Sequence, residues 1–194
     1  MSEFQLFFIL GTEHILDINA YDHILFVIAL SAVYQATDWK KVLILVTAFT
    51  IGHSVTLALV ALDVFSVNSV WVEFLIPVTI FITAAFNIWR REAYLSADMS
   101  KLNYYFALFF GLIHGMGFSN YLKGIIGKET SILEELFAFN LGLELGQVII
   151  VTAFMVIGYL MNKYISISRK DWILAISSAV AGIAITLMIE TKFW

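Results

Sequence analysis

Long apolar stretches joined by short polar connections make up most of the chain. A spanning helix needs about 20 mainly apolar residues, and six stretches meet this length: 20–36, 41–62, 70–90, 103–122, 132–161 and 171–190. The fifth is long enough to tilt or to extend beyond the lipid. Residues 4–16 are apolar but short, which is typical of an interfacial or re-entrant helix. The pattern predicts an all-α polytopic membrane helix bundle with six transmembrane helices and this short N-terminal helix.

Composition supports a membrane protein and limits its chemistry. Hydrophobic residues make up 61% of the 194 residues and charged residues 13%, with a mean hydropathy of +0.90, which is too apolar for a soluble domain. No basic stripe accompanies the net charge of -4, which argues against nucleic acid as a partner. The absence of cysteine leaves imidazole and carboxylate as metal ligands. No linker or repeat divides the chain, so we expect residues 1–194 to form a single transmembrane domain.

The basic residues predict an orientation in the bilayer. Eight of the eleven lysine and arginine residues lie in the connections after the first, third and fifth stretches: Lys40, Lys41, Arg90, Arg91, Lys101, Lys163, Arg169 and Lys170. Short connections rich in these residues stay in the cytoplasm. We therefore expect an integral protein of the inner (cytoplasmic) membrane with both termini on the outer, periplasmic side. The lipid bilayer is then its main surroundings, and a homo-oligomer is compatible with this arrangement.

All four histidines are expected in the outer half of the bilayer. At about 1.5 Å per residue, His53 lies ~13 Å below the outer end of its helix, and His114 and Asn140 each lie ~12 Å below theirs. His14 and His23 fall near the outer surface. Polar groups buried in hydrocarbon need partners, so this shared depth indicates that several helices meet at one polar site.

Imidazole and carboxylate in a membrane interior are suited to a divalent transition metal such as nickel, zinc, cobalt or copper. We expect an outer station of His14, Asp22 and His23 and a deeper station of His53, His114 and Glu144. Five further residues are expected to orient these ligands: Thr50, Ser54, Glu73, Asn140 and Gln147. Asn140, Glu144 and Gln147 are spaced four and three apart, which places them on one helix face. Glycines near the deeper ligands allow close helix approach: Gly111, Gly115, Gly117, Gly142 and Gly146.

Simpler interpretations remain open for single residues. A lone histidine in a membrane helix often only forms a hydrogen bond to a neighbouring helix, and His14 beside Glu13 is compatible with simple solvation. Asp22 and Glu73 each begin a predicted span, where an acidic side chain caps the helix. The grouping of His53, His114 and Glu144 at one depth favours a metal site over three separate hydrogen bonds, because an unpaired membrane carboxylate is costly.

Several blocks of the sequence together resemble the HupE/UreJ family. They are Gly11-Thr12-Glu13-His14-Ile15-Leu16 leading to Tyr21-Asp22-His23-Ile24-Leu25-Phe26, Phe49-Thr50-Ile51-Gly52-His53-Ser54-Val55-Thr56-Leu57, Phe110-Gly111-Leu112-Ile113-His114-Gly115-Met116-Gly117-Phe118 and Phe139-Asn140-Leu141-Gly142-Leu143-Glu144-Leu145-Gly146-Gln147. The family consists of small membrane proteins linked with hydrogenase and urease maturation, and the resemblance implies metal uptake, especially of nickel. By position, it implies metal handling by His14, Asp22, His23, His53, His114 and Glu144. Seven residues separate His14 from Asp22, whereas five separate the corresponding residues of the permease pattern.

Three functions are compatible with these residues. The leading hypothesis is a divalent-metal permease or membrane metal-binding protein, although the predicted inner half offers few ligands besides Asn87. The alternative is an intramembrane metal-dependent hydrolase, in which His53, His114 and Glu144 hold a metal that activates water. A third is a metal that only clamps the bundle. We favour the permease over an enzyme.

Overall fold

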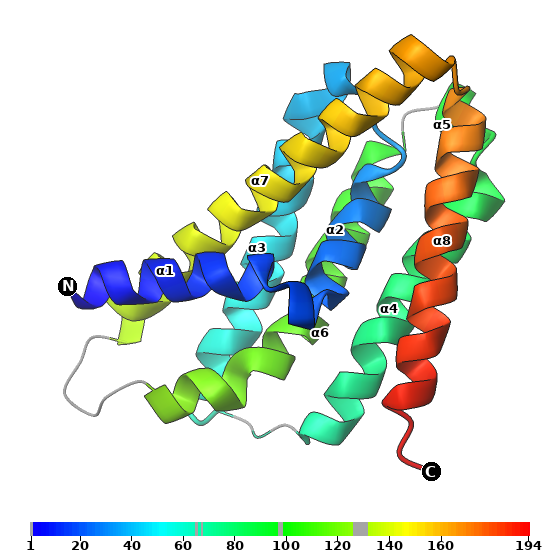
Figure 1. The fold of residues 1–194 in the computed structure, drawn as a ribbon. Coiled ribbons are helices and arrows are strands. Elements are labelled where there is room, and N and C mark those ends of the chain that lie inside the picture. Colours follow the sequence, from blue (N-terminus) through cyan, green and yellow to red (C-terminus); the bar gives the residue numbers. More distant parts are fainter. Residues whose placement is uncertain (1, 65, 67, 97–98, 126–131) are drawn as a thin grey trace.

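The computed structural model describes residues 2–64, 66, 68–96, 99–125 and 132–194. Within these ranges the chain is helical and contains no strand. The helices are α1 (Glu3–Leu16), α2 (Asp22–Ser31), α3 (Trp39–Ala61), α4 (Ser69–Arg90), α5 (Ala93–Ser96), α6 (Ser100–Ile125), α7 (Ile132–Ile165) and α8 (Arg169–Glu190), with 3-10 turns at Ile18–Ala20 and Ala36–Asp38 (Figure 1). The all-α prediction is confirmed.

Among the described residues, four helices are long and apolar enough to cross a membrane. They are Ala36–Ala61, Ser69–Arg90, Ile132–Ile165 and Arg169–Glu190. At 34 residues α7 extends about 51 Å, which exceeds the ~30 Å hydrocarbon layer and agrees with the length expected of the fifth stretch. The stretch 103–122 lies within the 26-residue helix α6. The total of six spans stays a prediction.

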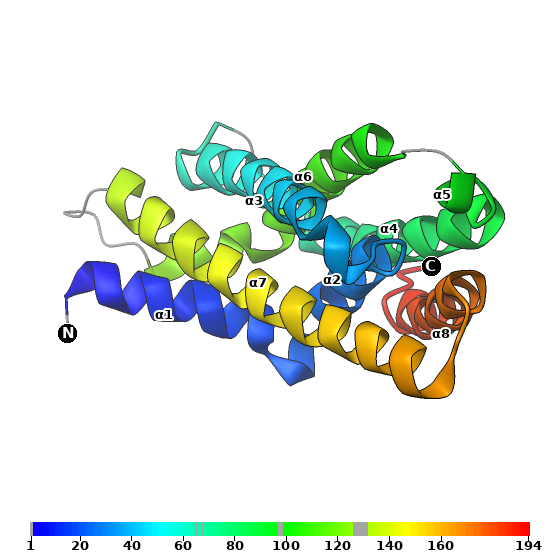
Figure 2. The ribbon, with the colours of Figure 1, turned by 90° about the horizontal axis from the view of Figure 1, so that it is seen from above.

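The first predicted span differs from the structure. Instead of one helix over 20–36, α2 ends at Ser31 and has ten residues, about 15 Å of rise, which is too short to cross the bilayer alone. Seven of the ten are buried, because α2 packs among α3, α4, α7 and α8 near the centre of the bundle (Figure 2). Its apolar side chains therefore cover protein rather than lipid. Hydropathy does not distinguish a buried short helix from a spanning one.

Glycines bring two pairs of helices into backbone contact. In the α3–α6 pair, a Cβ at Gly52 would overlap the carbonyl oxygen of Leu108, and one at Gly111 would overlap that of Phe49. Only glycine permits such an approach, as in membrane helix pairs built on small residues. The predicted role of Gly111 is confirmed, and the contact places the middle of α3 against the middle of α6.

The α1–α7 pair is packed in the same way. A Cβ at Gly11 would overlap the carbonyl oxygen of Phe139, and one at Gly142 would overlap that of Phe8. Thr12 Oγ1 also donates to the Gly142 carbonyl oxygen at 3.1 Å. The short helix α1 is thereby held against the first half of α7 (Figures 1 and 2). The expected N-terminal helix over 4–16 exists, and it carries His14 into the bundle.

The basic connections gather at one end of the bundle. Lys170, at the start of α8, forms an ion pair with Glu92, which follows α4. The end of α7, the start of α8 and α5 lie together at the top of Figure 1. This arrangement agrees with placing these connections on one side of the membrane. Which side faces the cytoplasm stays a prediction.

Candidate metal centre

The four histidines of the chain converge from four different helices. We call His14 of α1, His23 of α2, His53 of α3 and His114 of α6 the histidine cluster. The ring centroids of His14 and His23 lie 4.6 Å apart, those of His23 and His114 5.3 Å, and those of His14 and His53 6.1 Å. His53 and His114 are fully buried, with 0% exposure. Residues separated by up to a hundred positions in sequence therefore form one compact polar group.

Several buried ring nitrogens of the histidine cluster have no hydrogen-bond partner. One potential ligand atom each from His14, His23 and His53 lies within 4.8 Å of the others. Five ring nitrogens are buried and have no hydrogen-bond partner: His14 Nε2, His23 Nε2, both nitrogens of His53 and His114 Nε2. Buried polar atoms normally have partners. Tetrahedral ligands at about 2.1 Å from a metal would be roughly 3.4 Å apart, so modest ring movements suffice to fit one.

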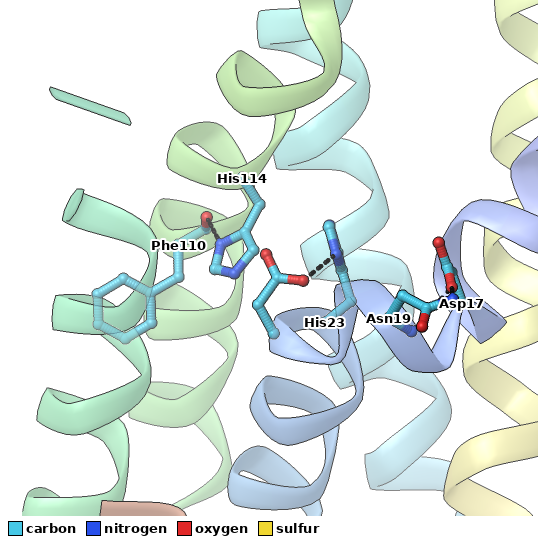
Figure 3. Close-up of polar contacts among 6 residues, drawn as sticks. Asp17, Asn19, His23, Phe110 and His114 are labelled. Atoms are coloured by element: carbon cyan, nitrogen blue, oxygen red, sulfur yellow. Dashed lines mark hydrogen bonds and ion pairs between the residues drawn. The ribbon is translucent and has the colours of Figure 1, made fainter. Parts of the chain in front are cut away.

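Two of these rings are oriented by hydrogen bonds. His114 Nδ1 donates to the Phe110 carbonyl oxygen at 2.9 Å, and His23 Nδ1 lies 3.2 Å from Asp22 Oδ1 (Figure 3). A carbonyl oxygen only accepts, so His114 carries its proton on Nδ1. The same tautomer follows for His23 if its carboxylate partner is ionised. In both rings the Nε2 lone pair is then free, which is the arrangement of metal-binding histidines held by an oxygen acceptor.

Aromatic side chains close the histidine cluster on several sides. The Phe118 ring centroid lies 4.0 Å from that of His14, and the Phe26 centroid lies 4.9 Å from that of His114. Phe139 stacks on His53 with an interplanar angle of 18°. These apolar rings lower the local polarity and thereby strengthen the electrostatic interactions inside the site. The sequence did not single out Phe118 or Phe139, although each lies within four residues of a glycine or histidine already noted.

The structure brings the histidines of the two expected metal stations close together. His14 and His23 of the outer station lie beside His53 and His114 of the deeper station. The depth estimate placed them apart because it assumed that residues 20–36 form a straight spanning helix. Since α1 and α2 meet at the turn Ile18–Ala20, both of their histidines enter the bundle at the level of His53.

Glu144 is not part of this group. Among the described residues, the group whose ligand atoms lie close enough to hold a metal is His14, His23 and His53, without His114. Glu144 accepts a hydrogen bond of 2.5 Å from Thr47 Oγ1. One turn further along α7, Gln147 Oε1 accepts from Thr50 Oγ1 at 2.9 Å. The predicted face of Glu144 and Gln147 therefore meets α3 at Thr47 and Thr50. The sequence analysis did not identify Thr47 as a partner. Its spacing of three residues from Thr50 nevertheless matches the spacing of Glu144 and Gln147, which accept the two hydrogen bonds.

The remaining predicted residues lie around the cluster in different roles. Ser54 Oγ donates to the Thr50 carbonyl oxygen at 2.6 Å, so it satisfies its own helix. Asn140 Oδ1 is buried without a partner. Glu73 is exposed and lies with Asp22 in a cleft of about 230 Å³. Asp22 lines this acidic cleft and also contacts the buried His23 ring. It therefore links the cleft to the histidine cluster.

A second cleft reaches the cluster from the side of α1. It has a volume of about 630 Å³, and its lining includes Glu13, His14, Asp17 and Phe118. Acidic side chains therefore border both openings beside the histidines. Negative charge at such openings raises the local concentration of cations.

Comparison with known proteins agrees with these features. A family model described as HupE / UreJ protein matches residues 1–191. No curated protein and no solved structure matches the chain. The match includes every helix that contributes to the histidine cluster and all four candidate spans. The chain is thus an integral membrane protein with a buried histidine cluster, and it belongs to the HupE/UreJ family.

Proposed function

We propose that this protein binds a divalent transition metal in the histidine cluster and passes it across the cytoplasmic membrane. The observation that carries this proposal is the set of five buried ring nitrogens without partners, contributed by four helices. Leaving such atoms unsatisfied costs about 1–3 kcal/mol each, which a bound cation would offset. The metal is the transported cargo.

The donor set favours certain metals. Imidazole nitrogen suits nickel, copper, zinc and cobalt, whereas calcium and magnesium prefer oxygen. His14, His23 and His53 would supply three ligands and His114 a fourth, with Asp22 holding the His23 ring. Membership in the HupE/UreJ family makes nickel the first metal to test.

The surroundings of the cluster favour access from the end that carries the acidic clefts. A cation would meet Glu73 and Asp22, or Glu13 and Asp17, before reaching the imidazoles. Beyond the cluster, the void bordered by Gln147 is only about 10 Å³ and otherwise apolar. Release toward the basic end therefore requires α2, α3 and α7 to separate. With that end in the cytoplasm, transport would be inward and both termini would face outward.

The hydrolase alternative receives less support from the geometry. It relied on Glu144 as a ligand beside His53 and His114, and Glu144 is bonded to Thr47 instead. Ser54, considered as a group that polarises a substrate, donates to its own helix. An all-histidine site could still activate water, so chelator-sensitive hydrolysis of a lipid or peptide would favour that function.

Metal analysis and flux test the proposal in sequence. Purified protein in lipid nanodiscs should bind about one nickel ion per chain, and His53→Ala should abolish binding because this ring contributes two unpartnered nitrogens. Thr186→Ala, an exposed change on α8, is the matched control. Proteoliposomes with an enclosed nickel-sensitive dye should show uptake with the control and none with His53→Ala. Failure to bind any of the four metals would overturn the site, and stoichiometric binding without flux in either direction would overturn transport.

A further inference from the structure

A further cavity lies at the opposite end of the bundle from the histidine cluster. Its volume is about 230 Å³, and it lies where α7 ends, α8 begins and the chain leaves α2 (Figure 1). The lining residues are Tyr34, Gln35, Ala36, Thr37, Phe154, Met155, Gly158, Tyr159, Asn162, Ile167, Arg169 and Trp172. None of them takes part in the proposed metal site.

Arg169 gives this cavity a positive charge that no carboxylate of the described residues neutralises. Its Nη2 atom donates to the Val33 carbonyl oxygen at 2.8 Å, while its Nε atom is buried without a hydrogen-bond partner. In the described part of the chain, Arg169 has no ion pair. A guanidinium group with unused donors is suited to a planar or tetrahedral oxyanion.

The acidic groups nearby are already engaged elsewhere. Asp171 Oδ2 accepts a hydrogen bond of 2.6 Å from Ser168 Oγ, and Asp38 lies 3.5 Å from Lys41 Nζ. Glu92 pairs with Lys170. The charged group that lines the cavity is therefore cationic, and a divalent cation would be repelled there. This charge argues against a role as the inner vestibule for the metal.

The floor of the cavity is apolar and aromatic. Phe154 and Trp172 lie with ring centroids 5.4 Å apart, and the Trp172 ring covers Gly158, where a Cβ would approach it to 3.2 Å. Tyr159 on the rim is half exposed, at 54%. Tryptophan and tyrosine at the end of a spanning helix mark the level of the lipid headgroups. The cavity thus combines a cationic rim with an apolar floor at the depth of a phospholipid phosphate.

We propose that this cavity binds the headgroup of an anionic phospholipid, with the phosphate on Arg169 and the upper acyl chain along Phe154 and Trp172. Basic pockets between membrane helices on the cytoplasmic side bind such headgroups. The bound lipid joins α7 and α8 to the end of α2, because Arg169 already contacts Val33. This inference does not depend on the metal site.

Native mass spectrometry of the purified protein with defined lipids tests this proposal. Wild-type protein should retain one phosphatidylglycerol molecule per chain in preference to phosphatidylcholine, and this lipid should raise its unfolding temperature. Arg169→Gln should reduce retention several-fold and remove the thermal effect, while Arg169→Lys should keep part of both. Arg90→Gln is the matched control, since this arginine is at the same end but lies over the Trp89 ring, outside the cavity.

Three outcomes would overturn the inference. Equal retention of phosphatidylglycerol and phosphatidylcholine would remove the role of charge, and equal losses in Arg169→Gln and Arg90→Gln would remove the role of the cavity. Displacement of the lipid by inorganic phosphate at equal concentration would identify a free-anion site in place of a lipid site. Nickel binding by Arg169→Gln reports separately on the histidine cluster and should be unchanged. It also shows that the variant is folded.

Discussion

Replacing Gly115 by alanine tests whether the close packing of α3 and α6 positions the histidine cluster. A Cβ at this position would overlap the His53 carbonyl oxygen and lie 2.9 Å from the His53 Cα. Both are backbone atoms, so no side-chain rotation relieves the contact. Carbon atoms pack at about 3.5–4.0 Å, so the two helices must separate by roughly 1 Å.

This displacement should affect metal binding more than folding. Overpacking of this kind costs typically about 1–3 kcal/mol of stability. Metal–ligand distances tolerate shifts of only about 0.2 Å, so a displacement of roughly 1 Å should weaken or remove His53 as a ligand. We expect Gly115→Ala to lower nickel affinity at least ~10-fold, which is about 1.4 kcal/mol.

Calorimetric nickel titration and thermal unfolding in the same detergent measure the two effects. Gly182→Ala on α8 is the matched control, because a Cβ there meets nothing within 4 Å. The control should bind nickel normally and be unchanged or slightly stabilised, by up to about 1 kcal/mol, since alanine suits a helix interior better than glycine. Wild-type affinity and wild-type stability in Gly115→Ala would refute the idea that glycine contact sets the geometry of the site.

Three other changes have defined outcomes. Asp22→Asn should weaken nickel binding about 10–100-fold without unfolding the protein, because it loosens the carboxylate contact that orients His23; metal titration measures this. Thr47→Val should lower the unfolding free energy by about 1–3 kcal/mol, since it removes the hydrogen-bond donor to Glu144. The hydrogen bond from the lysine of α8 lowers the pKa of Glu92 below 4.5, so any stabilisation from this pair is present above pH 4.5 and lost as the pH falls through the lowered pKa. Thermal unfolding of wild type and Glu92→Gln should therefore converge in acid.

Each of these expectations has a result that contradicts it. Unchanged nickel affinity in Asp22→Asn would mean that the carboxylate does not orient the ring. Equal stability of Thr47→Val and Thr186→Val, an exposed threonine bonded only within α8, would mean that the contact to α7 contributes nothing. A stability difference between wild type and Glu92→Gln that grows in acid would have the wrong sign for a lowered pKa.

Parts of the candidate site follow from local sequence. The acceptor side chains of α7 were placed on one face by their spacing, and Glu144 and Gln147 do share a partner helix. The glycines around His114 predicted close approach, and Gly115 does meet the backbone at His53. These features were predictable because helix periodicity and the need for a small side chain are properties of neighbouring residues.

Other features of the candidate site could not be predicted from the sequence, because they depend on how the helices pack against one another. Spacing placed Glu144 at the depth of His53, but it did not show that Thr47 would take its carboxylate. Depth alone separated His14 from His53, whereas the structure brings their rings to 6.1 Å. Depth in the membrane is only one coordinate. To predict which residues share a metal, the rotation of each helix about its axis and the identity of its neighbouring helices are needed as well.

The sequence by itself determined a helical membrane protein of the HupE/UreJ family with polar groups buried in apolar surroundings, since the bilayer permits few other ways to satisfy the polar groups of the backbone. Only the tertiary structure decided that all four histidines form one cluster, that α2 is a short helix covered by protein, and that Arg169 lines a separate cavity. The physical reason is that lipid and a protein interior are both apolar. Hydropathy indicates that a side chain is removed from water. Packing between helices determines whether that side chain then contacts lipid or other parts of the protein.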